Sequence, residues 1–318
     1  MMLAWEAVGF NLAYQKGQLG RQVDWIGGNL QVTASGIVAK VKDSIVQDIR
    51  DDLDYFRGLN VLPVKRVRSF VGRANHAAGL LLLLRPFLHA IWGALYSDGA
   101  GAPPNTIWAK QISHSLQWLD AFFRSEPKRL TRTFTLEEHG NMGPCWEIGT
   151  DASPWGLGGW LACNGDIKRY FACSVSQEDL DLYEIKLGSC NGQQTLEGLA
   201  ILVAMRLWGD HDEARKVRLS VKGDNVGALM LLVKMRPSSP QQAIIARELA
   251  LITSRSAFPP QVVHTPGIAH KLADSLSRLH GPGHKHDAFK HPALNAAARD
   301  EVPPRPRTWY RALGAPVR

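Results

Sequence analysis

Three short extended segments followed by alternating helices and strands constrain the fold of this 318-residue chain more than any other feature. The extended segments are expected at about 145–151, 156–163 and 167–173, and the Asn164-Gly165 pair before the third is typical of a hairpin turn. The periodicity then predicts a helix at 192–208, a strand at 216–222, helices at 225–234 and 240–254, a strand at 261–264 and a last helix at 270–279. This order predicts an α/β fold, a mixed five-stranded sheet with flanking helices.

The preceding part of the chain is predicted to be mostly helical. Apolar residues recur at helical spacing over 37–57, Pro63 opens a second helix, and residues 107–124 form a third. Asp51-Asp52 is expected on a solvated face of the first of these helices. The apolar run 77–92 approaches the length of a membrane span, but Arg85-Pro86 interrupts it. We therefore expect a buried helix there rather than a membrane helix.

Extended segments complete this part of the chain. Residues 8–14 and 21–28 are expected to form strands, and residues 130–136 form a connecting strand. The Gly/Pro/Asn-rich stretch 97–105 indicates a boundary. Residues 281–318 are rich in Pro, Ala, Arg and His, and we expect a mostly disordered tail.

The positive charge is placed unevenly along the chain. The net charge is +8, yet residues 145–280 are neutral, with 14 Lys and Arg against 14 Asp and Glu. Basic flanks attract phosphates, so this distribution favours a nucleic-acid partner, although charge alone also fits a generic basic protein. The four cysteines show no metal-ligand spacing and are expected to be reduced thiols of an intracellular protein, in the cytoplasm or the nucleus. No signal peptide is apparent.

Four acidic residues stand in settings that suit metal binding. Asp151 follows an apolar strand, Glu197 lies in a strongly helical stretch, Asp224 ends a strand, and Asp274 precedes Ser275-Leu276 in the last helix. Hard divalent cations take oxygen ligands, and two such ions stabilise the attacking and leaving oxygens of a phosphodiester. The acids therefore predict a site for two Mg²⁺ or Mn²⁺ ions. Taken singly, each acid is more often an N-cap or a solvated residue.

The order Asp, Glu, Asp, Asp resembles the ribonuclease H domain of retrotransposon reverse transcriptases. The closing segments Val263–Gly267 and Leu272–Arg278 are similar to the H-x-P-G and A-D-x-L-S-R end of such domains. The resemblance covers about residues 146–280 and implies a ribonuclease H-like sheet. It also implies an upstream organisation of a palm remnant over 1–35, a thumb-like region over 36–100 and a connection over 101–145. The basic tail over 281–318, inferred from its composition, would follow the domain.

The resemblance implies an RNA–DNA hybrid as partner and roles for particular residues. Asp151, Glu197, Asp224 and Asp274 are the implied metal ligands and catalytic residues, and His264 is implied in proton transfer or product release, with a structural histidine as the alternative. Residues expected to contact nucleic acid are small polar neighbours of the acids and cations of the thumb-like helix: Ser153, Asn225, Lys65, Arg66, Arg68 and Arg73. For the cations, an ordinary solvated face is the alternative.

Two departures from the family pattern leave other functions open. His270 stands where the closing motif usually has Asn, which predicts a weaker supporting contact. The hydrophobic hairpin with the polymerase's paired aspartates is absent, so we do not expect DNA synthesis by this chain alone. A polymerase part of a longer polyprotein is a possible partner, and no membrane is expected. The alternatives to a hybrid-cutting nuclease are a catalytically inactive nucleic-acid-binding remnant and a transposase- or integrase-like enzyme.

Overall fold

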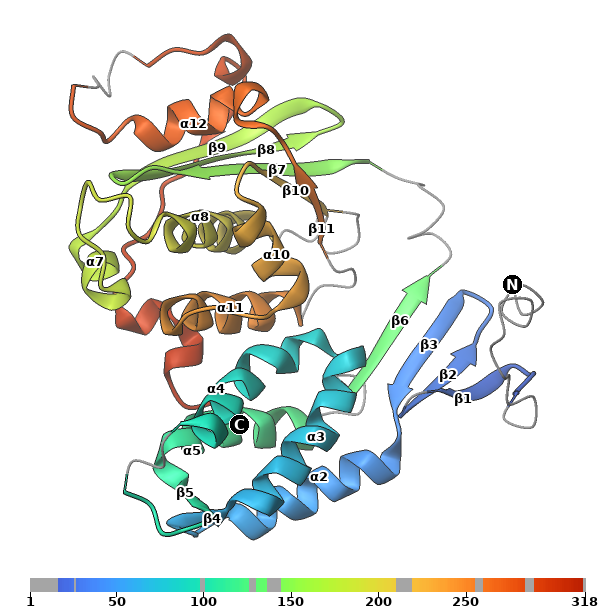
Figure 1. Cartoon of the computed structure of the whole chain (residues 1–318). Coiled ribbons are helices and arrows are strands. Elements are labelled where there is room, and N and C mark those ends of the chain that lie inside the picture. Colours follow the sequence, from blue (N-terminus) through green and yellow to red (C-terminus); the bar gives the residue numbers. More distant parts are fainter. Residues whose placement is uncertain are drawn as a thin grey trace, which may run out of the picture.

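The chain folds into an α/β body and a helical body that pack against each other (Figure 1). The computed structural model describes residues 17–25, 27–97, 101–125, 130–135, 144–209, 219–254, 260–283 and 289–316. The strand expected at 8–14 lies outside these residues. No helix among them is long and apolar enough to cross a membrane. The apolar run 77–92 instead ends one helix and begins another, with Leu84, Phe87 and Ile91 fully buried.

A mixed sheet forms the centre of the α/β body, with the order β11-β10-β7-β8-β9-β12. Strands β7 (Trp146–Ala152), β8 (Gly156–Cys163) and β9 (Asp166–Ser174) form an antiparallel meander. Strands β10 (Leu219–Gly223) and β11 (Gln261–His264) add in parallel beside β7. This arrangement confirms the predicted fold class, a ribonuclease H-like mixed sheet with flanking helices. A two-residue strand, β12 (Ala298–Arg299), extends the sheet beyond the five expected strands.

Helices cover both faces of this sheet (Figure 1). On one face lie α8 (Gln193–Trp208), α10 (Val226–Lys234) and α11 (Pro240–Thr253). Helix α8 is apolar on nearly all sides because it packs between the sheet and the other two helices. A further helix, α7 (Gln177–Tyr183), was not expected; it begins at a capping box formed by Ser176 and Asp179.

Helix α12 (Lys271–Arg278) covers the opposite face and approaches β8 very closely. A Cβ atom at Gly158 would lie 2.4 Å from the backbone nitrogen of Ser277, and one at Gly156 would lie 2.6 Å from the Ser277 carbonyl oxygen. Only glycine leaves room for this approach. The two glycines therefore fix how near the residues of α12 lie to the centre of the sheet.

The helical body is built from four helices around an aromatic core. They are α2 (Asp43–Phe56), α3 (Val64–Leu80), α4 (Arg85–Tyr96) and α5 (Ala109–Arg124), with a 3-10 turn at Leu82–Leu84. The short strands β4 (Val61–Pro63) and β5 (Thr106–Trp108) pair beside them. Phe70, Phe87 and Phe123 are fully buried, and they belong to a hydrophobic core that continues into the α/β body.

A second sheet of four strands replaces part of a predicted helix. Residues 37–41 were expected to begin a helix, but they form β3 (Gly36–Val41), and α2 begins only at Asp43. Strand β3 pairs with β2 (Gly28–Val32) and with β6 (Thr131–Thr135), while β1 (Gln22–Trp25) pairs with β2. The β-branched residues Ile37, Val38 and Val41 suit a paired strand, and pairing with distant strands overrides the local helical spacing.

Asp52 also departs from the expected solvated helix face. Its carboxylate is 4% exposed and accepts a 3.0 Å hydrogen bond from the Arg66 guanidinium, and Arg73 pairs with its other oxygen. Helical spacing alone placed Asp52 on the outer face. The packing of α2 on α3 instead turns this side chain toward two arginines that neutralise it.

The C-terminal segment 289–316 is ordered rather than mostly disordered. The Arg305 guanidinium and the Asp179 carboxylate form a buried ion pair at 2.5 Å, and the Tyr310 hydroxyl donates to the same carboxylate at 3.3 Å. The His114 ring and the Trp118 indole of α5 then bond the carbonyl oxygens of residues 312 and 314. The segment therefore connects the two bodies: its Arg305 and Tyr310 side chains bond Asp179 of the α/β body, and its backbone carbonyl groups bond side chains of α5 in the helical body.

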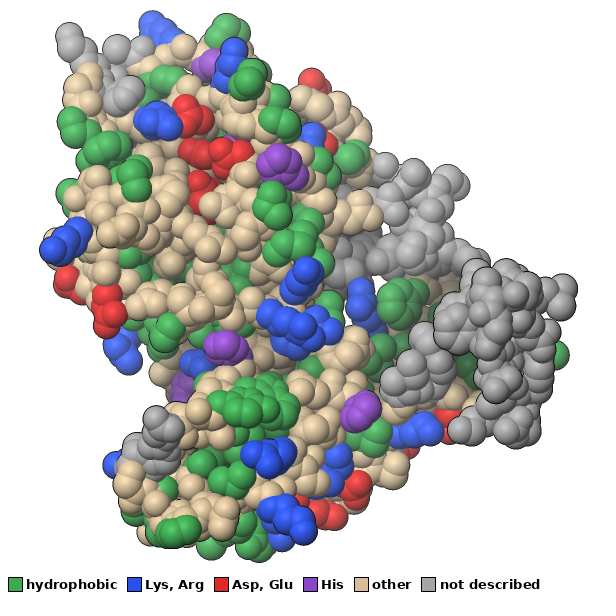
Figure 2. Space-filling view, viewed as in Figure 1, with side chains coloured by type: hydrophobic (Ala, Val, Ile, Leu, Met, Phe, Trp, Pro, Cys, Tyr) green, Lys and Arg blue, Asp and Glu red, His purple; other side chains and the backbone are tan. Residues whose placement is uncertain are grey.

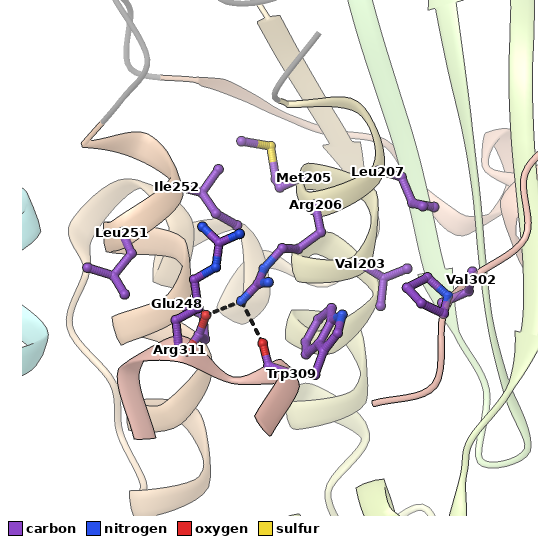
Figure 3. A pocket seen from close by; sticks show the side chains of 11 residues that line it. Val203, Met205, Arg206, Leu207, Glu248, Leu251, Ile252, Val302, Trp309 and Arg311 are labelled. Carbon is purple, nitrogen blue, oxygen red and sulfur yellow. Dashed lines mark hydrogen bonds and ion pairs between the residues drawn. The ribbon is translucent and has the colours of Figure 1, made fainter. Parts of the chain in front are cut away.

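A small cavity lies where this segment crosses α8 and α11 (Figure 3). It has a volume of about 230 Å³. The Arg206 guanidinium pairs with the Glu248 carboxylate and donates to the carbonyl oxygen of Trp309 at 3.0 Å. The second oxygen of Glu248 accepts the backbone N–H of Ala312 at 2.5 Å. The polar groups of the cavity wall thus hold the segment in place.

Candidate metal centre

Three of the four predicted acids converge at one edge of the central sheet. Oxygen atoms of Asp151, Glu197 and Asp224 all lie within 4.8 Å of one another. Figure 2 shows acidic side chains gathered on the surface of the α/β body at this level, near α12. Asp151 and Glu197 are buried, and Asp224 is partly exposed at the entrance. The group is therefore open to solvent on one side only.

Sheet register brings the two aspartates together. Strands β7 and β10 run parallel, with Gly149 paired to Lys222, so Asp151 and Asp224 each follow two residues later at the same edge. The carboxyl ends of neighbouring parallel strands meet at one edge of a sheet, where ligand sites commonly form. Glu197 comes from the second turn of α8, which packs under β7.

Asp151 is 4% exposed and is held by α12. The Ser277 hydroxyl donates a 2.6 Å hydrogen bond to Oδ2 of Asp151. Burial raises the pKa of the Asp151 carboxyl to about 6, and the charges of Asp224 and Asp274 add to this, against the Ser277 bond that lowers it. The carboxylate form is thus unfavourable at this position without a compensating cation.

Glu197 is 5% exposed and is held by Gln193 one turn earlier. The Gln193 amide donates to Oε1 of Glu197 at 3.0 Å and to the Ala152 carbonyl oxygen at 2.5 Å. Burial raises the pKa of Glu197 well above its usual range, and the Asp151 charge acts in the same direction. Burial and like charge therefore disfavour the ionised form of both acids.

This donor set fits a hard divalent cation. Within the described part of the chain, no Lys or Arg forms an ion pair with any of the three acids. Like charges held this close are unstable unless they share protons or bind a metal ion. Carboxylate oxygens are the ligands that Mg²⁺ and Mn²⁺ prefer in proteins. Asp151, Glu197 and Asp224 could hold such an ion together.

Asp274 lies beside this group rather than within it. It is in the first turn of α12, its side chain is 43% exposed, and Nε of Arg278 donates to its Oδ1 at 2.6 Å. Its charge nevertheless raises the pKa of Asp151. The four predicted ligands are thus arranged as a compact group of three with one neighbour.

The residues next to the acids occupy different positions. His264 is exposed at the end of β11, in register with Gly223. The Asn225 side chain caps α10 by accepting the Ala228 N–H at 3.0 Å. Ser153 is 2% exposed, and its hydroxyl donates to the Ser277 carbonyl oxygen at 2.8 Å, so it holds α12 against the sheet.

The four predicted phosphate-contacting cations lie on α3 in the helical body. Arg66 and Arg73 pair with Asp52, whereas Lys65 and Arg68 are exposed. The fold does not bring any of the four to the acids; they belong to a different surface.

Sequence reasoning missed the residues that support the acids. His270 was expected to give a weaker contact, but its ring is 4% exposed and its Nε2 lies 2.8 Å from the Thr150 carbonyl oxygen, next to Asp151. Ser277 and Gln193 were not singled out. The sequence indicates these two residues only through their spacing from the acids. Ser277 follows Asp274 by three residues and Gln193 precedes Glu197 by four, so each pair lies on one helix face.

Comparisons with known proteins add distant likenesses in structure. The chain matches no protein-family model and no curated protein. Solved structures similar to it include LC11-RNase H1 isolated from compost, at 16% identity and a TM-score of 0.34, covering 42% of this chain and 91% of that one. Another is RNase H1 from Halobacterium salinarum NRC-1, at 14% identity and 0.31, covering 43% and 95%. A third, a foamy viral protease-reverse transcriptase in complex with double-stranded DNA, matches at 13% identity and 0.28, covering 78% of this chain and 38% of that one.

Proposed function

We propose that this chain is a metal-dependent endonuclease that cuts the RNA strand of RNA–DNA hybrids, as the ribonuclease H part of a retrotransposon reverse transcriptase. The observation that carries the proposal is the group of Asp151, Glu197 and Asp224, two of them buried and none in an ion pair with a Lys or Arg of the described structure. Asp151, Glu197 and Asp224 would hold divalent ions there, which would activate water and stabilise the charge that develops on a phosphodiester.

The chain's own residues prepare the site for this chemistry. Ser277 and Gln193 fix the orientation of Asp151 and Glu197, so that the ligand oxygens are in place before metal arrives. Asp274 adds negative charge on the side of α12, and its pairing with Arg278 keeps it oriented. His264 is exposed at the neighbouring strand end, where its imidazole is accessible from solvent.

The motif order in the sequence supports the hybrid as substrate. The closing segment Val263–Gly267 contains the end of β11, and Leu272–Arg278 lies in α12. Gly267 lies next to the acids, since a Cβ atom there would be 3.5 Å from Oδ2 of Asp224. The segments that resemble the end of retroelement domains thus border the three-acid group. This agreement between motif and geometry favours an active nuclease over an inactive remnant.

The proposal is tested with strand-labelled substrates and a metal titration. The protein is incubated with an RNA–DNA hybrid, single-stranded RNA, double-stranded RNA and double-stranded DNA, each with Mg²⁺, Mn²⁺ or EDTA. We expect cutting of the RNA strand of the hybrid alone, and only with a divalent ion. A parallel thermal-unfolding series should show stabilisation by the same ions, because they bind the folded state. Hybrid binding without cutting in either metal would instead identify a binding remnant.

A further inference from the structure

The carboxyl end of α10 is held by an arginine from the other body. Helix α10 ends at Lys234, and Met235 follows in the left-handed region at φ 51°. Nη1 of Arg85, at the start of α4, donates to the Lys234 carbonyl oxygen at 3.1 Å, and its Nε donates to the Ala78 carbonyl oxygen at 3.2 Å. Helix ends leave carbonyl groups without partners, so Arg85 caps α10 across the junction of the two bodies.

Three cations gather at this point, and we call Arg85, Lys234 and Arg236 the junction patch. Lys234 and Arg236 are exposed, and Arg85 is partly buried. Burial, and then the charge of Arg236, lower the pKa of the Arg85 guanidinium, which shows that the two arginines are close enough to repel each other. Among the described residues, no Asp or Glu forms an ion pair with any of the three.

Several other arginines of the described structure have acidic partners, whereas Arg50 bonds a backbone carbonyl oxygen and Arg247 lies over the Phe87 ring. Partners are present for Arg66, Arg73, Arg124, Arg169, Arg206, Arg278 and Arg305. The junction patch differs from these pairs: its three cationic residues meet at the end of α10, and no acid of the described structure forms an ion pair with them. Such a cluster costs electrostatic free energy in the free protein and is relieved by an anion.

Helix α10 sets the distance between the junction patch and the acids. Asn225, which caps its start, is next to Asp224, and Lys234 is its last residue. Nine residues at 1.5 Å each give a separation of about 13 Å along the helix. This separation is on the order of a few base-pair steps of a duplex. Figure 2 shows Lys and Arg side chains over the junction of the two bodies, on the same face as the acidic side chains.

We propose that Lys234 and Arg236 bind backbone phosphates of the RNA–DNA hybrid a few base pairs from the position cut at the acids. Arg85 is a positioning residue that fixes the end of α10 and adds positive charge. The proposal rests on the proposed function, and it extends the hybrid's binding surface from the α/β body to the junction with the helical body. None of the cations that the sequence suggested for phosphate contact belongs to it.

The test measures hybrid binding by the whole chain with Lys234→Glu/Arg236→Glu, in an Asp224→Asn background that prevents cutting. The matched control is Lys168→Glu, which reverses a charge beside the β8–β9 turn, at the opposite end of β7 from Asp151. We expect the double variant to weaken binding at low salt by roughly tenfold to a hundredfold. The slope of log K against log salt should decrease in magnitude by about two, since two phosphate contacts are lost. The control should change neither quantity.

Two results would overturn the proposal, and they are distinguishable from a failure of the proposed function. If the parent chain cuts the hybrid while the double variant binds with unchanged affinity and salt slope, the junction patch makes no phosphate contact and the nuclease proposal stands. If the parent chain neither binds nor cuts the hybrid, both proposals fail together. The exposed positions of Lys234 and Arg236 make loss of folding unexpected, and thermal unfolding of each variant checks this.

Discussion

The hydroxyl of Ser277 donates a 2.6 Å hydrogen bond to Oδ2 of Asp151, joining the last helix of the α/β body to its first strand. The contact depends on the glycines of β8, which let α12 lie directly on the sheet. It gives a buried carboxylate a fixed orientation and favours its charged form. A residue outside the set of ligands thus supports the central acid.

Removing this hydroxyl should weaken metal binding. With Ser277→Ala, the Asp151 carboxylate loses its donor, its pKa rises further, and Mn²⁺ affinity should fall by about tenfold. Calorimetric titration with Mn²⁺ measures the change. Ser275→Ala on the same helix is the control, because the Ser275 hydroxyl donates only to the Lys271 carbonyl oxygen. Equal affinities for the two variants would contradict the role given to Ser277.

Without metal, the acids should make the protein less stable as pH rises. A carboxyl whose pKa is raised on folding binds its proton more tightly in the folded state, so the stability cost is absent below the unfolded pKa of about 4 and complete above the folded value. For Asp151 the folded pKa is about 6. In EDTA at pH 7, Asp151→Asn should therefore unfold at a higher temperature than the parent chain, and the difference should vanish near pH 4.

The same variant should behave in the opposite way when metal is present. With saturating Mg²⁺ at pH 7, the parent chain gains stability from the bound ion and Asp151→Asn does not. Asp166→Asn, at an exposed hairpin position, should match the parent chain in both conditions. Thermal unfolding across pH 4–8 gives all of these values. Lower stability of Asp151→Asn than of the parent chain in EDTA at pH 7 would contradict the destabilising effect assigned to the buried Asp151 carboxylate.

Asp274 and Asp151 should differ in their effect on metal affinity. Asp274 lies outside the group of three and is paired with Arg278, so Asp274→Asn should change Mn²⁺ affinity by less than about threefold. Asp151→Asn should lower the Mn²⁺ affinity by at least about tenfold, because it removes one carboxylate from the group of three acids that would bind the ion. Both substitutions should slow cutting of a hybrid. An equal loss of affinity for the two variants would place Asp274 among the ligands of the same ion.

The C-terminal segment should depend on its buried ion pair. Arg305→Leu leaves the Asp179 carboxylate, which is fully buried, without its cation, and should cost about 3–5 kcal/mol in the free energy of unfolding. Arg307→Leu, two residues later at an exposed position, should cost less than about 0.5 kcal/mol. Denaturant unfolding and the rate of proteolysis within 289–316 measure the two effects. Similar behaviour of the two variants would show that the ion pair does not hold the segment.

The sequence predicted the α/β body closely because its elements are signalled locally. The Asn164-Gly165 turn, the caps at Asn225 and Ser239, and the apolar α8 all follow from short-range chemistry. Where distant pairing decides, the predictions failed, as at residues 37–41, which pair with β2 and β6.

Side-chain partners were less predictable than elements. The burial of Asp52 depends on Arg66 and Arg73 of another helix, and the order of the C-terminal segment depends on Asp179, 126 residues before Arg305. At the site, the motifs suggested the acids, but the support from Ser277 and His270 arises only when α12 meets β7 and β8.

The most direct test of the central claim compares cutting of one hybrid by two variants that each lose a carboxylate. An RNA–DNA hybrid labelled on either strand is incubated in Mn²⁺ with the parent chain, with Asp224→Asn and with Asp166→Asn. We predict that the parent chain and Asp166→Asn cut the RNA strand at equal rates, and that Asp224→Asn lowers the rate by at least about a hundredfold. Cutting by Asp224→Asn at the rate of the parent chain would contradict the assignment of the three acids as the active site.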